Sequence, residues 1–369
     1  MSWLRGAGGR RGSDAPRAYV DMVIGSQSYH RLPELVTKAE RGQGGQVALD
    51  FPEVQKFDLL PEQTASQGAS AFVSVQEGCD KFCSFCVVPY TRGAEYSRPV
   101  TKIEAEVRQH VALGAVEITL LGQNVNAYHG ETADGAEWSL GRLIRHLAEI
   151  DGLERIRYTT SHPRDMDDEL MRAHADVPQL MPYLHLPIQA GSDRTLKAMN
   201  RKHTAAEYLA IIEKLRALRP DMAFSGDFIV GFPGESEADF EATMRVVESV
   251  HYASAYSFKY SPRPGTPAAN GEQVPEEAKA ERLKRLQALL NKQQRQFNEQ
   301  TVGKTLPILL EKKGKKPGQL IGKSPYMQSV VVEAQDDQFE QLVTAEIISA
   351  HPNRLTGRLL SEALLSQVA

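Results

Sequence analysis

Residues 78–90 read GCDKFCSFCVVPY, and this stretch indicates how the rest of the chain is built. Cys79, Cys83 and Cys86 are all three cysteines of the 369-residue sequence. Disulfide pairing would leave one thiol over. A 4Fe–4S cluster held by three thiolates keeps one iron without a protein ligand, and that iron can bind a small molecule directly. The spacing C-x3-C-x2-C therefore predicts three ligands of such a cluster.

Two other uses of the three thiols stay open. Zinc prefers four ligands, so His110 or His129 would have to complete a zinc site. Buried structural cysteines are the second alternative. Phe82 and Phe85 lie inside the loop and suit a cluster that is shielded from water.

Length and composition define the setting. The chain is long enough for two or three domains, and hydrophobic residues make up 41% of it, which suffices for sizeable cores. No apolar run has the length of a membrane span, and the first residues lack the apolar segment of a signal peptide, so we expect a cytoplasmic protein. The net charge of −4 means that any nucleic-acid contact must come from a local basic patch.

Outward from the cysteines, short apolar segments alternate with helical patterns. Thr101 and Glu104 predict a capping box at the start of a helix, whose apolar stripe ends at Gly114. Alternating strands and helices predict an α/β fold with a parallel sheet, which binds ligands at the carboxyl ends of its strands. The predicted strands are Ala71–Gln76, Ala115–Gly122, Ile156–Thr160, Met181–Leu186, Phe224–Val230 and Ser254–Tyr260.

Polar motifs follow five consecutive strands of this series. They are LLGQNVNAY, TTSHP, HLPIQAGSD, DFIVGFPGES and FKYSPRPGTPA. One such loop alone is ordinary turn chemistry, but five at the same edge of a sheet predict the border of one active site. In IVGFPGES the glycines either let the backbone approach an adenosine or turn the chain before a helix capped by Ser236.

The C-terminal part has a different pattern. Residues Glu276–Gln300 predict a long connecting helix with Leu283, Leu286, Leu290 and Phe297 on one face. From Thr301 on, alternation in TLPILLEK, QSVVVEA and QLVTAEIISAHPNRLTGRLL predicts a small antiparallel β-barrel. Its lysines are either solvated loop residues or RNA-phosphate contacts, with stacking by Tyr326. These lysines, expected in loops, are Lys312, Lys313, Lys315, Lys316 and Lys323.

Taken together, the motifs resemble the tRNA methylthiotransferases, a family of radical S-adenosylmethionine (SAM) enzymes. The resemblance runs from about Val20 to the C-terminus, and LLGQNVNAY is more similar to the MiaB type than to the RimO type, which modifies a ribosomal protein. It implies a partial six-stranded (β/α) barrel followed by a TRAM-like domain. It also implies transfer of a methylthio group to C2 of N6-isopentenyladenosine at tRNA position 37. The implied partition is 1–18 as a basic tail, 19–66 as the remnant of an N-terminal domain, 67–300 as the radical SAM core and 301–369 as the TRAM-like domain.

The same resemblance implies a set of ligands and partners. The open iron of the cluster would hold the amino and carboxylate groups of SAM, whose cleavage yields a 5′-deoxyadenosyl radical. The expected partners are tRNA and an electron donor such as flavodoxin or ferredoxin. We expect a monomeric chain that does not bind a membrane. The implied SAM contacts are Phe85, Gly122, Gln123, Asn124, Ser161, Gln189, Arg201, Ile229, Gly231 and Glu235.

The beginning of the chain departs from the family pattern. The family carries an N-terminal domain whose three further cysteines hold a second 4Fe–4S cluster associated with sulfur delivery. No cysteine precedes Cys79, and Tyr19–Gly42 resembles only the last strand and helix of that domain. A truncated gene product, a misplaced start codon and a true variant are the three explanations. We therefore expect one cluster, no second one, an unknown sulfur donor and impaired sulfur insertion. The alternatives are another substrate, such as threonylcarbamoyl-adenosine in tRNA or a ribosomal protein, and a non-catalytic tRNA-binding remnant.

Overall fold

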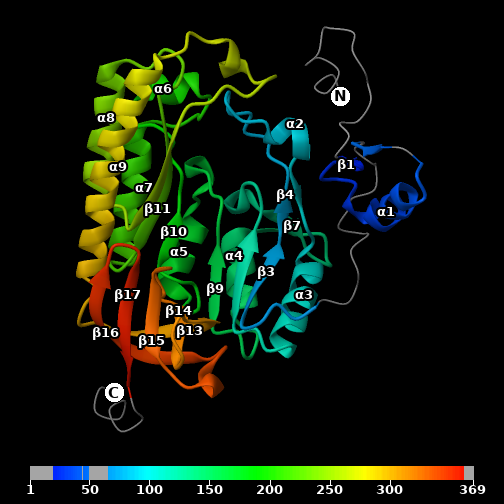
Figure 1. Cartoon of the computed structure of the whole chain (residues 1–369), viewed down its shortest axis with the longest axis vertical. Helices are drawn as coiled ribbons and strands as arrows, with labels where there is room; N and C mark the ends of the chain where they lie inside the picture. The colour runs from blue at the N-terminus through cyan, green and yellow to red at the C-terminus, as the bar shows by residue number, and fades with distance from the viewer. Residues whose placement is uncertain (1–19, 44, 50–64, 361–369) are drawn as a thin grey trace.

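The structure is a computed structural model that describes residues 20–43, 45–49 and 65–360 (Figure 1). Its centre is a curved sheet of six parallel strands, which confirms the predicted α/β class and partial barrel. Two halves, ordered β3-β6-β9 and β10-β11-β12, meet at a parallel bridge between Ile156 and Leu180. The strands are β3 (Ser70–Ser74), β6 (Glu117–Leu121), β9 (Arg155–Tyr158), β10 (Tyr183–His185), β11 (Ala223–Val230) and β12 (Ser254–Lys259).

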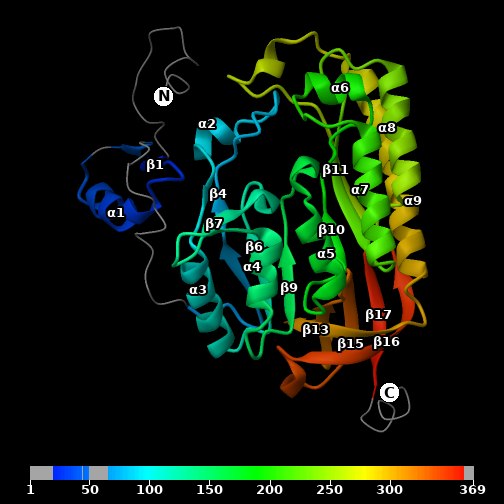
Figure 2. The same cartoon turned by 180° about the vertical axis from the view of Figure 1, so that it is seen from behind.

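Helices cover one face of this sheet. Figure 2 shows α3, α4, α5 and α7 in front of the strands, whereas Figure 1 turns the opposite, concave face to the viewer. The helices are α3 (Val100–Ala112), α4 (Leu140–Leu147), α5 (Asp168–Asp176), α7 (Ala205–Leu218), α8 (Glu237–Val250) and α9 (Glu276–Glu299). Shorter elements are β4 (Gln76–Glu77), α2 (Val88–Arg92), β5 (Tyr96–Ser97), β7 (His129–Glu131), β8 (Glu137–Ser139) and α6 (Asp193–Ala198).

The strands bury only the face that the helices cover. Val73 and Phe228 point toward the helices and are fully buried in the core. Alternate positions point the other way, and there Phe72, Tyr256 and Phe258 are 55%, 62% and 54% exposed. The concave inner face of the sheet is therefore accessible and carries aromatic rings.

The start of α3 differs from the prediction. The helix begins at Val100 after Pro99, without a side-chain cap, so the capping box of Thr101 and Glu104 is wrong. The physical reason is that Pro99 already sets the first turn one residue earlier, while Glu104 binds Arg108 and His146 instead. At α8, by contrast, Ser236 caps the helix as one of the two interpretations of IVGFPGES predicted.

The C-terminal strands form the predicted small barrel, closed in the order β13-β14-β15-β17-β16. Two details differ from the prediction: β14 was not foreseen, and β15 pairs with β17 in parallel. Lys312, Lys313 and Lys323 end strands and do not lie in loops; Lys315 and Lys316 follow β13. The strands are β13 (Thr305–Lys313), β14 (Gln319–Lys323), β15 (Ser329–Glu333), β16 (Leu342–His351) and β17 (Arg354–Leu359).

This barrel docks against the amino ends of the parallel strands (Figure 1). Arg155 donates to the carbonyl oxygens of Lys323 (3.1 Å) and Pro307 (2.6 Å). Arg157 donates to those of Pro325 (2.9 Å) and Ser324 (3.0 Å). Both arginines are buried, so these hydrogen bonds fix the barrel to the sheet.

Two neighbouring predictions concern this junction. The predicted connecting helix is confirmed as α9, which buries Leu286 and Leu290, packs on β12 and touches β16. The stacking role of Tyr326 stays a prediction. Its ring packs edge-on against Phe297 at 5.7 Å and its hydroxyl donates to Asp221, so the side chain belongs to the junction of the two parts.

The described N-terminal residues form a small βαβ unit. β1 (Met22–Ile24) and α1 (Leu32–Glu40) confirm the predicted strand and helix, and a parallel strand β2 (Gln46–Ala48) completes the unit. The predicted tail 1–18 lies outside the described residues. Among the described helices, none combines the length and the apolar character that a membrane crossing would require.

Candidate active site

The cysteine loop lies between β4 and α2, at the carboxyl ends of the parallel strands. Cys83 is buried, and Cys79 and Cys86 are half-buried. The amide of Cys86 donates to the carbonyl of Cys83 at 2.9 Å, so the chain turns tightly between these two thiols. Gly78, with φ of +75°, begins the loop where a Cβ would meet the carbonyl oxygen of Ala94 at 2.0 Å. Any other residue would clash here, so only glycine fits at this turn.

Contacts from α6 and the residues after it hold the other side of the loop. The amide of Ser84 donates to the carbonyl of Met199 at 3.0 Å, and the Asn200 side chain donates to the carbonyl of Phe82 at 2.8 Å. Phe85 packs against the main core, whereas Phe82 is 51% exposed beside Tyr90, so only Phe85 provides the expected shielding.

Burial disfavours free thiolates in the cysteine loop. Burial raises the pKa of the Cys79 thiol to about 11 and raises that of Cys86 as well, so both would be neutral thiols without a cation nearby. Arg201 places its Nη1 3.6 Å from the sulfur of Cys83. Iron provides the positive charge that keeps such buried sulfurs as thiolates, so the donor set fits an iron–sulfur cluster.

The zinc alternative gains no support from the described residues. Among them, no three His, Cys, Asp or Glu side chains lie close enough together to hold a metal ion, and this includes Cys79, Cys83 and Cys86, so the exclusion of zinc rests on the two histidines. His110 is buried on α3 next to Gln67, and His129 contacts the carbonyl of Ala127 at 3.0 Å. Neither histidine is thus arranged as a fourth ligand.

A glutamine that the sequence analysis did not select organises the loop after β6. Gln76 accepts hydrogen bonds from the amides of Gln123 (2.9 Å) and Asn124 (3.0 Å), and donates to the carbonyl of Gly78 (2.7 Å). The Gln123 side chain accepts from the amide of Gly78 at 2.8 Å. At Gly122 a Cβ would meet the side-chain oxygen of Gln76 at 2.6 Å. Gly122 and Gln123 thus join this loop to the cysteine loop.

Most of the buried polar atoms without a hydrogen-bond partner gather around the cysteine loop. Seven of the nine such side-chain atoms among the described residues lie on the loops at this edge. Predicted members are Asn124 Oδ1, Ser161 Oγ and Arg201 Nε; unpredicted ones are Glu95 Oε1, His162 Nε2, His203 Nε2 and Tyr260 Oη. Buried polar groups nearly always have a partner, so this concentration fits a polar ligand such as the amino-acid and ribose parts of SAM.

Charge at this edge is set by burial. Burial lowers the pKa of His162 to about 2 and that of His203 to about 4, so both imidazoles are neutral near pH 7. Burial also raises the pKa of Glu95 to about 7. Glu95 lines a cavity of about 420 Å³ together with Lys81, Arg164 and Asp165. Of the residues not predicted for the site, His162 has a signal in the sequence, because it lies within the polar motif TTSHP.

The remaining predicted residues lie at the same edge and help to fix its backbone. Gln189 adopts a left-handed backbone (φ of +78°), and its carbonyl accepts from the amide of Ile229 at 2.9 Å. The Glu235 carboxylate accepts from the amide of Gly231 at 3.1 Å and from Arg282 at 2.9 Å. Glu235 therefore fixes the turn after β11, and Gly231 supplies its positive φ of +68°.

Comparisons with known proteins agree with this geometry. A three-cysteine loop at the carboxyl edge of a partial barrel defines a radical SAM enzyme, and residues 73–247 match the model of the radical SAM superfamily. Residues 299–360 match the TRAM domain. A solved radical SAM methyltransferase, TsrM from Kitasatospora setae, has a TM-score of 0.50 at 14% identity, with 67% of this chain and 52% of that chain covered. This likeness concerns the fold alone.

Curated relatives identify the family. The tRNA-2-methylthio-N(6)-dimethylallyladenosine synthase of Wolbachia pipientis wMel is 60% identical over 344 residues, which cover 92% of this chain and 78% of that protein. The protein of the same name from Wolbachia sp. subsp. Brugia malayi (strain TRS) is 60% identical over 93% of this chain and 79% of its own length. The chain belongs to this family of radical SAM methylthiotransferases.

Proposed function

We propose that the chain acts on C2 of N6-isopentenyladenosine in tRNA, the modification that the name of its relatives describes, and that the target is position 37, as the resemblance to the family implies. The observation that carries this proposal is that one loop with three cysteines and most of the unpartnered buried polar groups lie at the same edge of the sheet. When bound by Cys79, Cys83 and Cys86, a 4Fe–4S cluster would supply the electron that cleaves SAM into methionine and a 5′-deoxyadenosyl radical.

The chain's own side chains would hold SAM beside the cysteine loop. Asn124, Ser161 and Arg201 each keep a buried polar atom free for a ligand. Gln123 and Glu235 support them by fixing the loops, since their side chains are engaged in the protein, and Gly122 lets Gln76 approach. The side-chain amide of Gln189 would contact SAM directly, while its carbonyl holds the amide of Ile229. Phe85 packs below the loop and keeps water from it.

The inner face of β10, β11 and β12 is suited to receive the target base. His185 lies 2.8 Å from Ser225 Oγ and 3.5 Å from the Asp227 carboxylate, which gives hydrogen-bonding groups for the edge of a purine. Tyr256 pairs with Asp227 across the strands and Phe258 with Ile229, so two exposed rings flank this polar group. Exposed rings offer stacking to an unpaired base.

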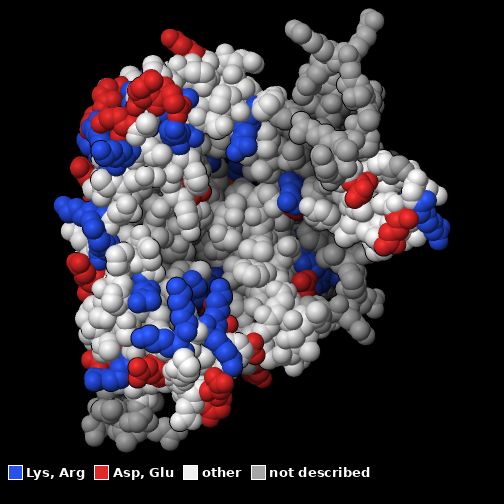
Figure 3. Space-filling model, viewed as in Figure 1, with Lys and Arg blue, Asp and Glu red and all other residues white. Residues whose placement is uncertain are grey.

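The C-terminal barrel would bind the remainder of the tRNA. Figure 3 shows Lys and Arg side chains gathered over β13 and β14, below the hollowed centre of the concave face. Lys312, Lys315 and Lys316 are exposed and form no ion pair with the described residues, whereas Lys313 pairs with Asp336 at 3.0 Å. The proposed electron donor is a flavodoxin or a ferredoxin. The chain is proposed to act as a monomer.

Sulfur insertion is a separate requirement. These 369 residues contain three thiols, and all lie in one loop, so they provide ligands for one cluster. Attaching sulfur to an unactivated aromatic carbon needs a donor held next to the substrate. We therefore expect 5′-deoxyadenosine from SAM, but little 2-methylthio product from these residues alone.

Anaerobic reconstitution tests the proposal. The wild-type chain should bind about four irons and form 5′-deoxyadenosine when reduced, and Cys83→Ala should abolish both. Mass spectrometry of tRNA bearing isopentenyladenosine measures the product. Close to eight irons per chain, or robust methylthiolation, would overturn the one-cluster proposal. Tight tRNA binding without 5′-deoxyadenosine would instead support a non-catalytic tRNA-binding protein.

A further inference from the structure

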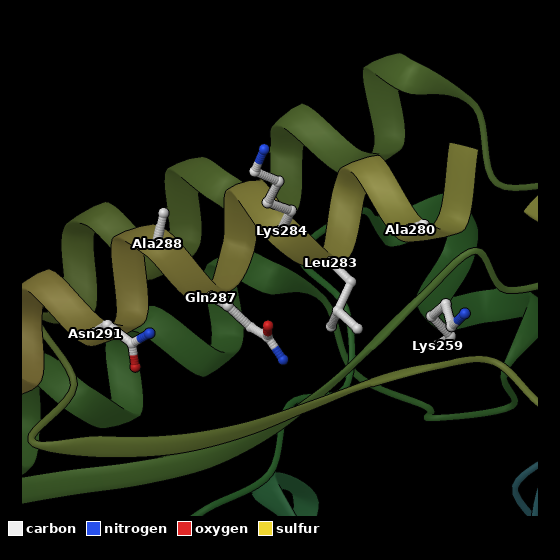
Figure 4. A pocket seen from close by; sticks show the side chains of 7 residues that line it. All are labelled: Lys259, Ala280, Leu283, Lys284, Gln287, Ala288 and Asn291. Atoms are coloured by element: carbon white, nitrogen blue, oxygen red, sulfur yellow. The ribbon is translucent and has the colours of Figure 1, made fainter. Parts of the chain in front are cut away.

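A groove of about 400 Å³ lies outside the candidate active site, between α9 and β12 (Figure 4). Lys259 borders it on the strand side. From α9, Leu283, Gln287 and Asn291 point toward the strand, whereas Lys284, which also lines the groove, projects its ammonium group away from the strand. Leu283 is half-buried against the core, so the groove has an apolar floor and polar borders.

The charge of the groove favours an anionic partner. Its lining contains two lysines and two amide side chains but no carboxylate, in a chain of net charge −4. Lys259 pairs with Glu276 at one end of the groove. Lys284 is exposed and has no ion-pair partner within residues 20–43, 45–49 and 65–360. The amides of Gln287 and Asn291 are exposed as well and can donate and accept hydrogen bonds.

The groove adjoins the inner face of the sheet across a single strand. β12 is the edge of its sheet, next to β11 alone. Residues alternate along it, so Lys259 faces α9 while Tyr256 and Phe258 face the opposite side with 62% and 54% exposure. A strand of RNA that crosses this edge would meet aromatic rings first and the lysine-bordered groove next.

We propose that this groove holds the nucleotides that flank the target adenosine in the tRNA anticodon loop. The proposal rests on the proposed function. Enzymes that modify a base take it out of its stack, and contacts to the neighbouring nucleotides set the sequence context. Cations next to exposed rings are the usual surface for single-stranded nucleic acid. Continuity supports the assignment, because α9 extends from this groove to β16 of the C-terminal barrel.

A charge reversal tests the electrostatic part. Lys284→Glu should lower the affinity for an isopentenylated anticodon stem-loop about tenfold at roughly 0.1 M salt, since it replaces a phosphate contact by repulsion. Lys102→Glu is the matched control, because Lys102 is exposed on α3, across the molecule from α9 in Figure 1. Both variants should form 5′-deoxyadenosine from SAM without RNA as the wild type does. Loss of that reaction in the wild type would reject the proposed function and not the groove.

Photocrosslinking tests which partner occupies the groove. A benzophenone amino acid at Gln287 should crosslink the nucleotides next to the target adenosine, and the same group at Lys102 should not. Crosslinks to a second copy of the chain would show that the β12 edge pairs with protein. Crosslinks confined to other arms of the tRNA, or equal binding by Lys284→Glu and the control, would likewise overturn the proposal.

Discussion

Polar side chains are buried at both ends of the six parallel strands, but they have hydrogen-bond partners at one end and lack some of them at the other. At the amino ends, Glu117, Arg155 and Arg157 are almost completely buried, and hydrogen bonds or ion pairs engage all three. At the carboxyl ends, Ser161 Oγ and Arg201 Nε are buried without a partner among the described residues. The first arrangement attaches a domain, and the second leaves hydrogen-bonding capacity for a ligand.

This difference has an energetic meaning. Each unpartnered buried polar group costs about 1–3 kcal/mol of stability. A fold tolerates several of them in one place when a ligand later satisfies them. At the amino ends the carbonyl oxygens of Pro307, Ser324 and Pro325 already act as partners, so no ligand is needed there.

The largest effect should come from the amino ends. Arg157→Met removes the 2.9 Å pair with Glu117 and two hydrogen bonds to the C-terminal barrel. Breaking a buried pair from one side costs about 3–5 kcal/mol, so we expect a loss of about 3 kcal/mol, because Arg155 still partly neutralises Glu117. Chemical denaturation of the cluster-loaded protein measures it.

A surface arginine gives the matched control for that measurement. Arg145 pairs with Asp176 at 2.7 Å but is 35% exposed, so Arg145→Met should cost less than about 1 kcal/mol. The double variant Glu117→Gln/Arg157→Met should lose less than the sum of its single variants, because it leaves no unpaired carboxylate. Equal losses in Arg157→Met and Arg145→Met would mean that the junction contributes little.

A pair of serines compares the two ends directly. Ser161→Ala removes an unpartnered hydroxyl, so stability should stay the same or rise by up to about 1 kcal/mol, while the affinity for SAM falls about fivefold. Ser324→Ala is the counterpart at the junction. Its hydroxyl accepts from the amides of Tyr326 and Gln328 at 3.2 Å, so stability should fall by about 1–2 kcal/mol with SAM binding unchanged. Titration calorimetry and denaturation decide between the two patterns, and a loss of stability without a loss of affinity in Ser161→Ala would contradict the ligand role.

The carboxyl ends of the strands could be predicted from the sequence better than the amino ends. The carboxyl edge was predictable because strands alternate with Gly-rich and polar loops, and three cysteines in one loop have few uses. The residues that shape it were less visible. Gln76 and Glu95 bind or face groups far away in the sequence, so no local spacing indicates them.

The junction at the amino ends was not predictable from local patterns. Arg155 and Arg157 alternate along a strand as ordinary surface residues would. Their partners are main-chain carbonyls 152 to 168 residues later, a separation that only the tertiary fold bridges. The contacts of Tyr326 with Phe297 and Asp221 were not predictable for the same reason, since these partners lie far away in the sequence. Strand β14 was missed because its five residues include a glycine, Gly322, which packs closely against Leu309.

The smallest expected effect concerns the two surfaces of the C-terminal barrel, one docked on the sheet and the other exposed with lysines. If Lys312, Lys315 and Lys316 bind phosphates, replacing all three by Gln should lower the slope of log affinity for tRNA against log salt by about one unit for each phosphate that is no longer neutralised, because fewer counterions are released. Lys313 is left in place because it already pairs with Asp336. The control is Lys102→Gln, since Lys102 is exposed on α3 and forms no ion pair with the described residues. Its slope should stay that of the wild type, and an equally unchanged slope in the triple variant would assign the barrel lysines to solvent.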